Sequence, residues 1–102
     1  MRNREQHWLV RSDIREAYRW YEQQRHGLGR RFNQELRLVL GCLPADAFLY
    51  AVRFDDIRRV NLPSCPYGVF YFVEESKVVV LGVLHASRDT EAALQQRRKN
   101  FG

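Results

Sequence analysis

The sequence predicts an α+β fold in which an N-terminal antiparallel helical hairpin packs on a three- to four-stranded antiparallel sheet, followed by a short C-terminal helix. Apolar residues recur at helical spacing in the first half of the 102-residue chain. The second half changes to short runs rich in Val, Phe and Tyr, separated by polar or proline-containing turns. Because a chain of this length holds one hydrophobic core, we expect a single domain over residues 1–102.

The two expected helices carry apolar stripes at the i, i+3, i+4, i+7 spacing. The first begins at a cap formed by Ser12 or Asp13 and ends near Gly27, where glycine favours the left-handed backbone of helix ends. The second follows directly and is ended by Pro44. So short a connection predicts an antiparallel hairpin. The expected ranges are about 13–26 and 28–43.

The expected strands span residues 49–53, 57–62, 67–74 and 77–85. The last two are joined by a turn short enough for a β-hairpin. A closing helix follows over about residues 90–99, with Asp89 or Thr90 as its cap. Helices followed by consecutive antiparallel strands give the α+β order.

The last two expected strands carry apolar side chains on both faces. Strict alternation places Tyr67 and Tyr71 on one face, and Phe70 and Phe72 on the other. The next strand alternates in the same way, with Val78, Val80 and Leu84 against Val79, Leu81 and Val83. A helical hairpin covers one face of such a sheet. The second face needs the C-terminal helix, a second copy or a partner polypeptide, and we favour the partner.

Composition and charge narrow the function classes. The chain has a formal net charge of +5, and only Lys77 and Lys99 among its 17 basic residues are lysines. An arginine-rich surface suits bidentate contacts to carboxylates or phosphates. No apolar run approaches the length of a membrane span, and the N-terminus does not resemble a secretory signal, so we expect a cytoplasmic protein. Cys42 and Cys65 show no metal-site spacing, so we expect free thiols, no metal and no cofactor.

Several ordered segments together resemble the RelE/ParE toxin superfamily, and specifically its ParE-like branch. The matching segments are Asp13–Ala17, Trp20-Tyr21-Glu22, Gly27-Leu28-Gly29, Phe32, Glu35-Leu36, Ile57-Arg58-Arg59, Pro66–Tyr71, Val78–His85 and Arg88-Asp89. The resemblance implies the toxin of a type II toxin–antitoxin pair, bound and neutralised by a partly disordered antitoxin. That family normally opens with a strand, whereas residues 2–7 here are polar and poor strand formers. We therefore expect the first strand to be short, displaced or lost.

The resemblance offers two toxic activities. The RelE branch cleaves mRNA on the ribosome with basic residues, helped in some members by a late tyrosine or histidine. By strand register the arginine of that set falls on Gly68 and its late tyrosine on Leu94, while its two lysines fall near Arg59 and Asn61. The nuclease candidates that remain are Arg59, His85 and Arg88. The ParE branch, which poisons DNA gyrase, fits better, and a non-toxic relic that only binds antitoxin is a third interpretation.

Several residues are candidates for contact with the antitoxin or the target. They are Arg58, Arg59, Tyr67, Tyr71, Arg88, Arg97 and Arg98. The ordinary alternatives are core packing for the two tyrosines and a solvated helix end for the C-terminal arginines. Trp20 and Tyr21 are expected in the core.

Overall fold

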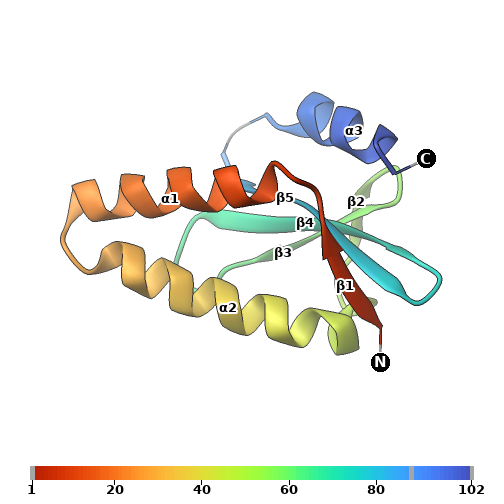
Figure 1. Cartoon of the computed structure of the whole chain (residues 1–102), viewed down its shortest axis with the longest axis horizontal. Helices are drawn as coiled ribbons and strands as arrows, with labels where there is room; N and C mark the ends of the chain where they lie inside the picture. Colours follow the sequence, from red (N-terminus) through yellow and green to blue (C-terminus); the bar gives the residue numbers. More distant parts are fainter. Residues whose placement is uncertain (1, 88, 102) are drawn as a thin grey trace.

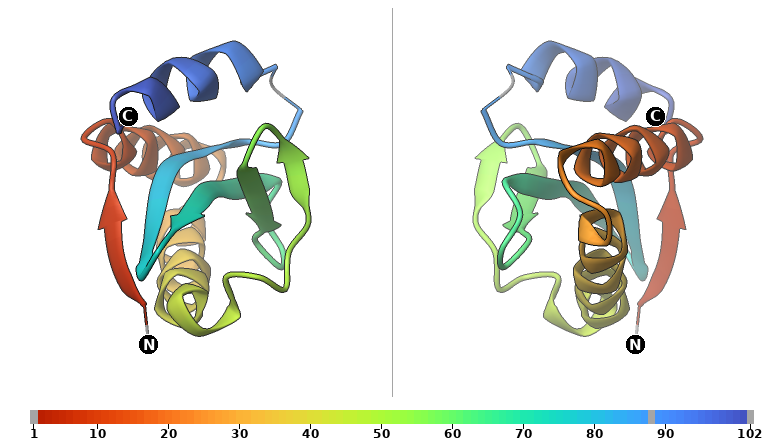
Figure 2. Two further views of the ribbon diagram at one scale, coloured as in Figure 1. Left: turned by 90° about the vertical axis from the view of Figure 1, so that its right-hand side faces the viewer. Right: turned by 90° about the vertical axis from the view of Figure 1, so that its left-hand side faces the viewer.

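Two helices lie side by side on one face of a sheet, and a third helix lies on the opposite face (Figures 1 and 2). The computed structural model describes residues 2–87 and 89–101. The antiparallel pair is α1 (Val10–Gln24) and α2 (Leu28–Asp46), and the third helix is α3 (Glu91–Lys99). The α+β class, the helical hairpin and the closing helix are confirmed. None of the described helices is long and apolar enough to span a bilayer.

The sheet is mixed and has five strands, which corrects the expected three or four antiparallel ones. They are β1 (Asn3–Gln6), β2 (Val52–Phe54), β3 (Ile57–Asn61), β4 (Tyr67–Glu74) and β5 (Lys77–His85). Their spatial order is β1-β5-β4-β3-β2. β1 pairs with β5 in parallel, and the other neighbours are antiparallel.

The polar first strand is present and short, which is one of the three outcomes expected for it. All four of its side chains are exposed, so it is held by backbone pairing rather than by an apolar face. The Asn3 amide donates to the Ser76 carbonyl and the His7 amide to the Val80 carbonyl. His7 itself is buried, its Nδ1 accepting from the Leu9 amide and its Nε2 lying 2.7 Å from Asn100 Oδ1. Because backbone hydrogen bonds to β5 and the buried His7 hold this edge strand, its side chains need not alternate between apolar and polar.

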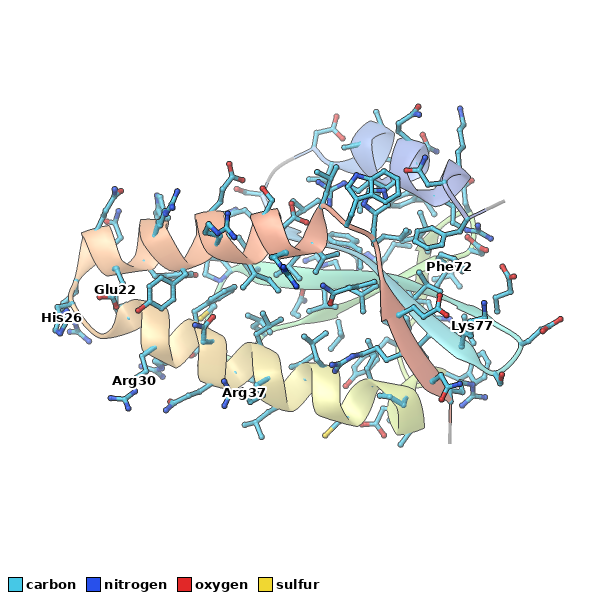
Figure 3. The ribbon with its side chains drawn as sticks, in the orientation of Figure 1. Glu22, His26, Arg30, Arg37, Phe72 and Lys77 are labelled. Atoms are coloured by element: carbon cyan, nitrogen blue, oxygen red, sulfur yellow. The ribbon has the colours of Figure 1, made fainter. Side chains whose placement is uncertain are left out.

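The hairpin closes tightly at its turn, where Glu22 of α1 meets the start of α2 (Figure 3). The Glu22 carboxylate accepts hydrogen bonds of 2.9 Å from the amides of Gly27 and Gly29. Gly27 has a φ of 95°, in the left-handed region that favours glycine. A Cβ on Gly29 would lie 2.7 Å from Glu22 Cγ and 2.8 Å from Tyr18 Cε2, so the helices meet this closely because residue 29 has no side chain.

The observed helix ends differ from the expected ones. α1 begins at Val10, so Asp13 lies inside its first turn and is buried rather than acting as the cap. α2 continues through Pro44 to Asp46. A proline this close to a helix end removes a single backbone donor from the last turn, so the helix persists for two more residues.

A β-bulge in β5 changes which side chains share a face. Phe70 pairs with Gly82 whereas Tyr71 pairs with Val80, so Leu81 is an extra residue in β5. Strict alternation therefore fails after Leu81. Val83 faces the hairpin and Leu84 faces α3, the reverse of the expectation.

The second face of the sheet is covered by the chain itself. Phe70, Phe72 and Leu81 pack with Leu94 of α3 and with Phe101, and Phe70 is the most exposed of the three strand residues at 4%. The expectation that a partner polypeptide must cover this face is wrong, because α3 is placed directly on it. Exposed large apolar side chains lie elsewhere. They are Trp8, Leu9, Tyr18, Trp20, Leu38, Phe48, Leu49 and Val52.

Candidate functional site

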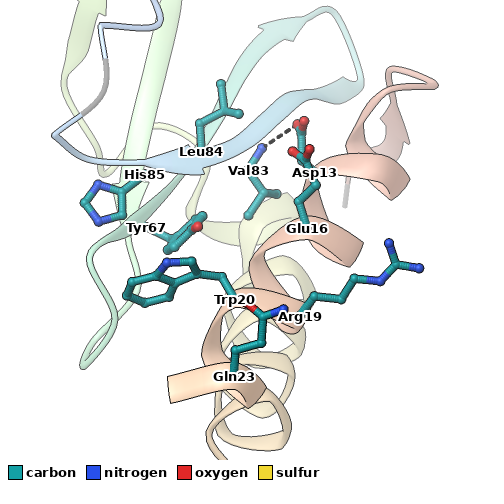
Figure 4. A pocket seen from close by; sticks show the side chains of 9 residues that line it. All are labelled: Asp13, Glu16, Arg19, Trp20, Gln23, Tyr67, Val83, Leu84 and His85. Atoms are coloured by element: carbon teal, nitrogen blue, oxygen red, sulfur yellow. Dashed lines mark hydrogen bonds between the residues drawn. The ribbon is translucent and has the colours of Figure 1, made fainter. Parts of the chain in front are cut away.

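A shallow pocket of about 320 Å³ opens where the end of β5 meets α1 (Figure 4). Trp20 and Arg19 of α1 lie on one side, and Tyr67 and His85 from β4 and β5 lie on the other. Trp20 is 45% exposed and thus not the core residue expected, while its neighbour Tyr21 is buried as predicted. The pocket combines the His85 imidazole and the rings of Trp20 and Tyr67 with charged side chains such as Glu16 and Arg19.

His85 is oriented by its own loop. Its Nδ1 accepts from the Ser87 amide at 3.1 Å and lies 2.7 Å from Ser87 Oγ. Its ring meets the Tyr67 ring edge-on at 5.3 Å, on the hairpin side of the sheet. His85 is therefore held as a boundary residue of the pocket.

Arg59 lies on the opposite face. Its side chain runs over Gly68, where an added Cβ would be 3.0 Å from Arg59 Nε, and its guanidinium sits 5.7 Å from the Phe70 ring centre. Arg59 Nε donates to Asn61 Oδ1 at 2.7 Å. Partial burial, together with the nearby charge of Arg53, lowers the pKa of Arg59.

The two described nuclease candidates, His85 and Arg59, are thus not brought together. His85 packs on the hairpin side, Arg59 lies on the α3 side, and Arg88 falls outside the described residues. Leu94, at the position of the late nuclease tyrosine, is fully buried against the sheet. Within residues 2–87 and 89–101 no cluster of three His, Cys, Asp or Glu side chains is arranged to hold a metal ion.

Arg97 forms an internal ion pair and is not the solvated helix end expected. Its Nη1 and Nη2 donate to the two carboxylate oxygens of Asp13 at 2.6 and 3.1 Å. Nη1 also donates to the Leu81 carbonyl at the bulge, and Asp13 Oδ2 accepts from the Val83 amide. The pair joins α1, β5 and α3. Sequence reasoning missed it because Asp13 is equally typical of a helix cap.

Arg98 and Arg58 are also engaged within the chain. Arg98 donates hydrogen bonds to the Asp56 carboxylate, with Nη2 2.9 Å from Oδ2. Its guanidinium carbon lies 3.7 Å from the ring centre of Phe72. The hydrogen bond and charge of Asp56 raise the pKa of Arg98. Arg58 Nη1 donates to the Tyr50 carbonyl at 2.6 Å, and its guanidinium lies 5.1 Å from the Phe48 ring centre.

The two strand tyrosines differ in accessibility. Tyr71 is fully buried and its hydroxyl donates to the Ala47 carbonyl at 2.7 Å. Burial raises the pKa of Tyr71 to about 12. The expectation that Tyr71 contacts a partner is corrected, since its surface is used inside the core. Tyr67 is half-buried among the rings of Tyr21, Phe32 and His85 and reaches the pocket.

Comparisons with known proteins agree with this architecture. Residues 5–90 match the family model described as "ParE toxin of type II toxin-antitoxin system, parDE". A solved structure described as "Chromosomal ParDE TA system from P. aeruginosa" superposes with a TM-score of 0.75, at 14% identity, over 85% of this chain and 98% of the other. No curated protein sequence matches. Because the family model spans most of the chain, this protein belongs to the ParE toxin family of type II toxin–antitoxin systems.

Proposed function

We propose that this chain inhibits DNA gyrase by protein–protein contact and is neutralised by a cognate antitoxin. The family match supports a toxin. The observation that favours gyrase over RNA is the separation of His85 and Arg59 onto opposite faces of the sheet. Cleaving a phosphodiester needs a base, a cation and an acid around one phosphate. The buried Leu94 has no group that can serve as base, cation or acid. Gly68 has no side chain, and the Arg59 side chain lies over it.

The non-toxic relic is less well supported than the toxin. That interpretation depended on a missing first strand, and β1 pairs with β5 over all four of its residues. With the sheet complete, nothing in the described fold separates this chain from a toxin with an intact scaffold.

Expression in a bacterium tests the gyrase proposal. DNA synthesis and protein synthesis are followed separately after induction. We expect DNA synthesis to fail first, and we expect His85→Ala and Arg59→Ala to retain growth arrest, since neither residue has a chemical step to perform. Early failure of protein synthesis with cleaved transcripts, abolished by those variants, would instead establish the mRNA endonuclease.

We further propose that the antitoxin covers the α2-end surface, defined as Leu38, Phe48, Leu49 and Val52. These side chains are 47–75% exposed, which is unusual for so many large apolar residues in one region. The guanidinium groups of Arg2 and Arg58 lie 4.5 and 5.1 Å from the ring centre of Phe48. An antitoxin segment that alternates apolar and acidic residues would match both features.

Two aspartate substitutions test this surface. Leu38→Asp and Leu49→Asp place a charge where we expect an apolar contact, so co-purification with the product of an adjoining short, acidic reading frame should fall at least tenfold. Leu9→Asp is the matched control, because Leu9 is also exposed but lies at the start of α1. Equal losses in all three variants would contradict the placement.

A further inference from the structure

A groove of about 560 Å³ runs between α1 and α2 at the hairpin end of the molecule. Tyr18 and Glu22 of α1 and His26 of the turn line one side, and Arg30 and Arg37 of α2 line the other. Figure 3 shows Arg30 and Arg37 projecting from α2, with Glu22 and His26 at the turn. We call these residues, with Asn33 and Gln34, the hairpin groove.

The hairpin groove is positively charged, and its one carboxylate is already used. Glu22 Oε1 accepts the Gly27 and Gly29 amides, and Oε2 lies 3.2 Å from His26 Nδ1. Within the described part of the chain, neither Arg30 nor Arg37 has an acidic partner. Other arginines, such as Arg97, do pair with carboxylates. The exposed guanidinium groups of the groove are available for an external anion.

Further exposed arginines lie along α1, and one of them, Arg19, also lines the pocket beside His85. Arg11, Arg15 and Arg19 recur every four residues and are all exposed, and the described residues offer none of them an ion pair. Like charges four residues apart destabilise a helix by roughly 0.2–0.5 kcal/mol per pair. The row therefore adds positive charge to α1 that no ion pair of the described residues offsets.

We propose that the hairpin groove and this arginine row bind the phosphate backbone of duplex DNA. Arg30 and Arg37 are seven residues apart, or about 10.5 Å along the helix at 1.5 Å per residue. Because the phosphates of one strand rise about 3.4 Å per step along the duplex axis, a helix face of this length can meet more than one of them. Guanidinium forks match phosphate geometry, and the amides of Asn33 and Gln34 are further donors.

The lining also separates this groove from the proposed antitoxin surface. Tyr18 is the single large side chain with apolar surface among its lining residues, whereas the α2-end surface is formed of Leu, Phe and Val. A protein segment binds by burying apolar area, while a nucleic acid backbone binds through charge. DNA binding goes beyond the proposed action on gyrase, and it is measured with no gyrase present.

The test is fluorescence anisotropy of the full chain with a labelled 20-base-pair duplex of arbitrary sequence, across a series of salt concentrations. The variant Arg30→Gln/Arg37→Gln should weaken binding by roughly tenfold or more near 0.1 M salt and reduce the slope of log K against log salt by about 1.8. The matched control is Arg4→Gln/Arg53→Gln, which removes the same charge from exposed positions on β1 and β2. We expect less than about a twofold change for the control.

Three results would overturn the proposal. Equal losses in the two double variants would show that net charge alone attracts DNA. Tighter binding of an RNA duplex of the same sequence would reject DNA as the ligand. Unchanged DNA binding with lost antitoxin binding in Arg30→Gln/Arg37→Gln would assign the groove to an acidic protein segment. Failure to inhibit gyrase, with DNA binding intact, would leave this proposal standing and reject only the gyrase target.

Discussion

At the scale of single residues, the Asp13–Arg97 ion pair connects three elements, α1, β5 and α3. Its groups are largely buried, with side-chain exposures of 5% and 13%, and they bond to each other and to the backbone of β5 on either side of Gly82. Breaking a buried pair by removing one charge leaves the other uncompensated. The pair should therefore matter much more than the exposed ion pairs of the same chain.

Replacing Asp13 with Asn should lower the free energy of unfolding by about 3 kcal/mol, because Arg97 keeps its charge without a counter-charge. Urea unfolding measures the change as a lower midpoint. Asp56→Asn is the control, since Asp56 is 51% exposed and pairs with Arg98 at the surface. That variant should lose less than about 1 kcal/mol. Equal losses would contradict the structural role of the buried pair.

Glu35 gives the fold an acid-sensitive contact. Burial acts to raise its pKa, but hydrogen bonds from the hydroxyl and amide of Ser64 outweigh it, so the pKa lies below its ordinary value of about 4.3. A lowered pKa stabilises the fold above the unfolded value, and this is lost as pH falls through the folded value. Stability should thus decline more gently below about pH 4.3 in Glu35→Gln than in the unsubstituted chain, as urea midpoints across pH would show. Glu16→Gln, at an exposed position, should leave the decline unchanged.

The positions of some single residues can be predicted from the sequence, whereas the roles of others cannot. The interior position of Tyr21 follows from helical spacing, and so does the helix face it shares with Ala17. The roles of Asp13, Arg97 and Arg98 do not follow, because the partners lie 42 to 84 positions apart in the chain. Charge pairing over such separations depends on the packing of α3, which local pattern does not encode.

At the scale of elements, the contact between α1 and α2 depends on one missing side chain. Gly29→Ala places a Cβ within 2.9 Å of Tyr18 and Glu22 atoms, so it should destabilise the fold by about 1–3 kcal/mol. Gly41→Ala is the matched substitution in the same helix, where nothing lies within 4 Å of the new Cβ. It should stabilise by about 0.5–1 kcal/mol, because alanine is the better helix former. Thermal unfolding separates the two, and a shift of the same sign in both would contradict the close packing.

The first strand offers an equally direct test. The amides of Asn3 and His7 point to β5, so by the two-residue repeat the amide of Glu5 does as well. Glu5→Pro removes that donor and should cost about 1–3 kcal/mol. Arg4→Pro removes an amide that points away from β5 and should cost clearly less. Similar losses in urea unfolding would mean that β1 contributes little through its backbone.

Strand and helix positions could largely be predicted from sequence, and the exceptions have physical causes. The bounds of β4 and β5 agree with the expected ones residue for residue. The exposed β1 has no apolar pattern to detect, and the bulge at Leu81 breaks the alternation on which face assignment relies. Both features are set by backbone pairing, which side-chain periodicity does not report.

At the scale of the whole molecule, α3 determines which apolar surfaces remain exposed. It covers the second apolar face, so the proposed antitoxin surface lies elsewhere on the molecule. Four of the eight exposed large apolar side chains found among the described residues lie on α2, on β2 or in the segment that joins them, and unpaired positive charge lies around the hairpin. The sequence correctly predicts a sheet with apolar side chains on both faces. That α3 covers one of these faces follows only from the structure, where Leu94 is buried against the sheet.

This separation predicts independent surfaces for the antitoxin and for DNA. Leu49→Asp should weaken antitoxin binding at least tenfold and leave DNA binding within about twofold, and Arg30→Gln/Arg37→Gln should do the reverse. Leu49 lies three residues beyond the end of α2, whereas Arg30 and Arg37 lie within its first ten residues, and additivity holds for distant sites. Binding of each variant to both ligands, measured by anisotropy, checks this. Loss of both functions in either variant would contradict the separation.

A supercoiling assay with purified gyrase, relaxed plasmid and this protein tests directly whether gyrase is the target. We expect micromolar protein to block supercoiling or to trap gyrase-cleaved DNA, and we expect addition of the antitoxin to restore activity. His85→Ala should inhibit as well as the unsubstituted chain. Supercoiling that continues unchanged at micromolar concentrations of the folded protein would contradict the assignment of gyrase as the target.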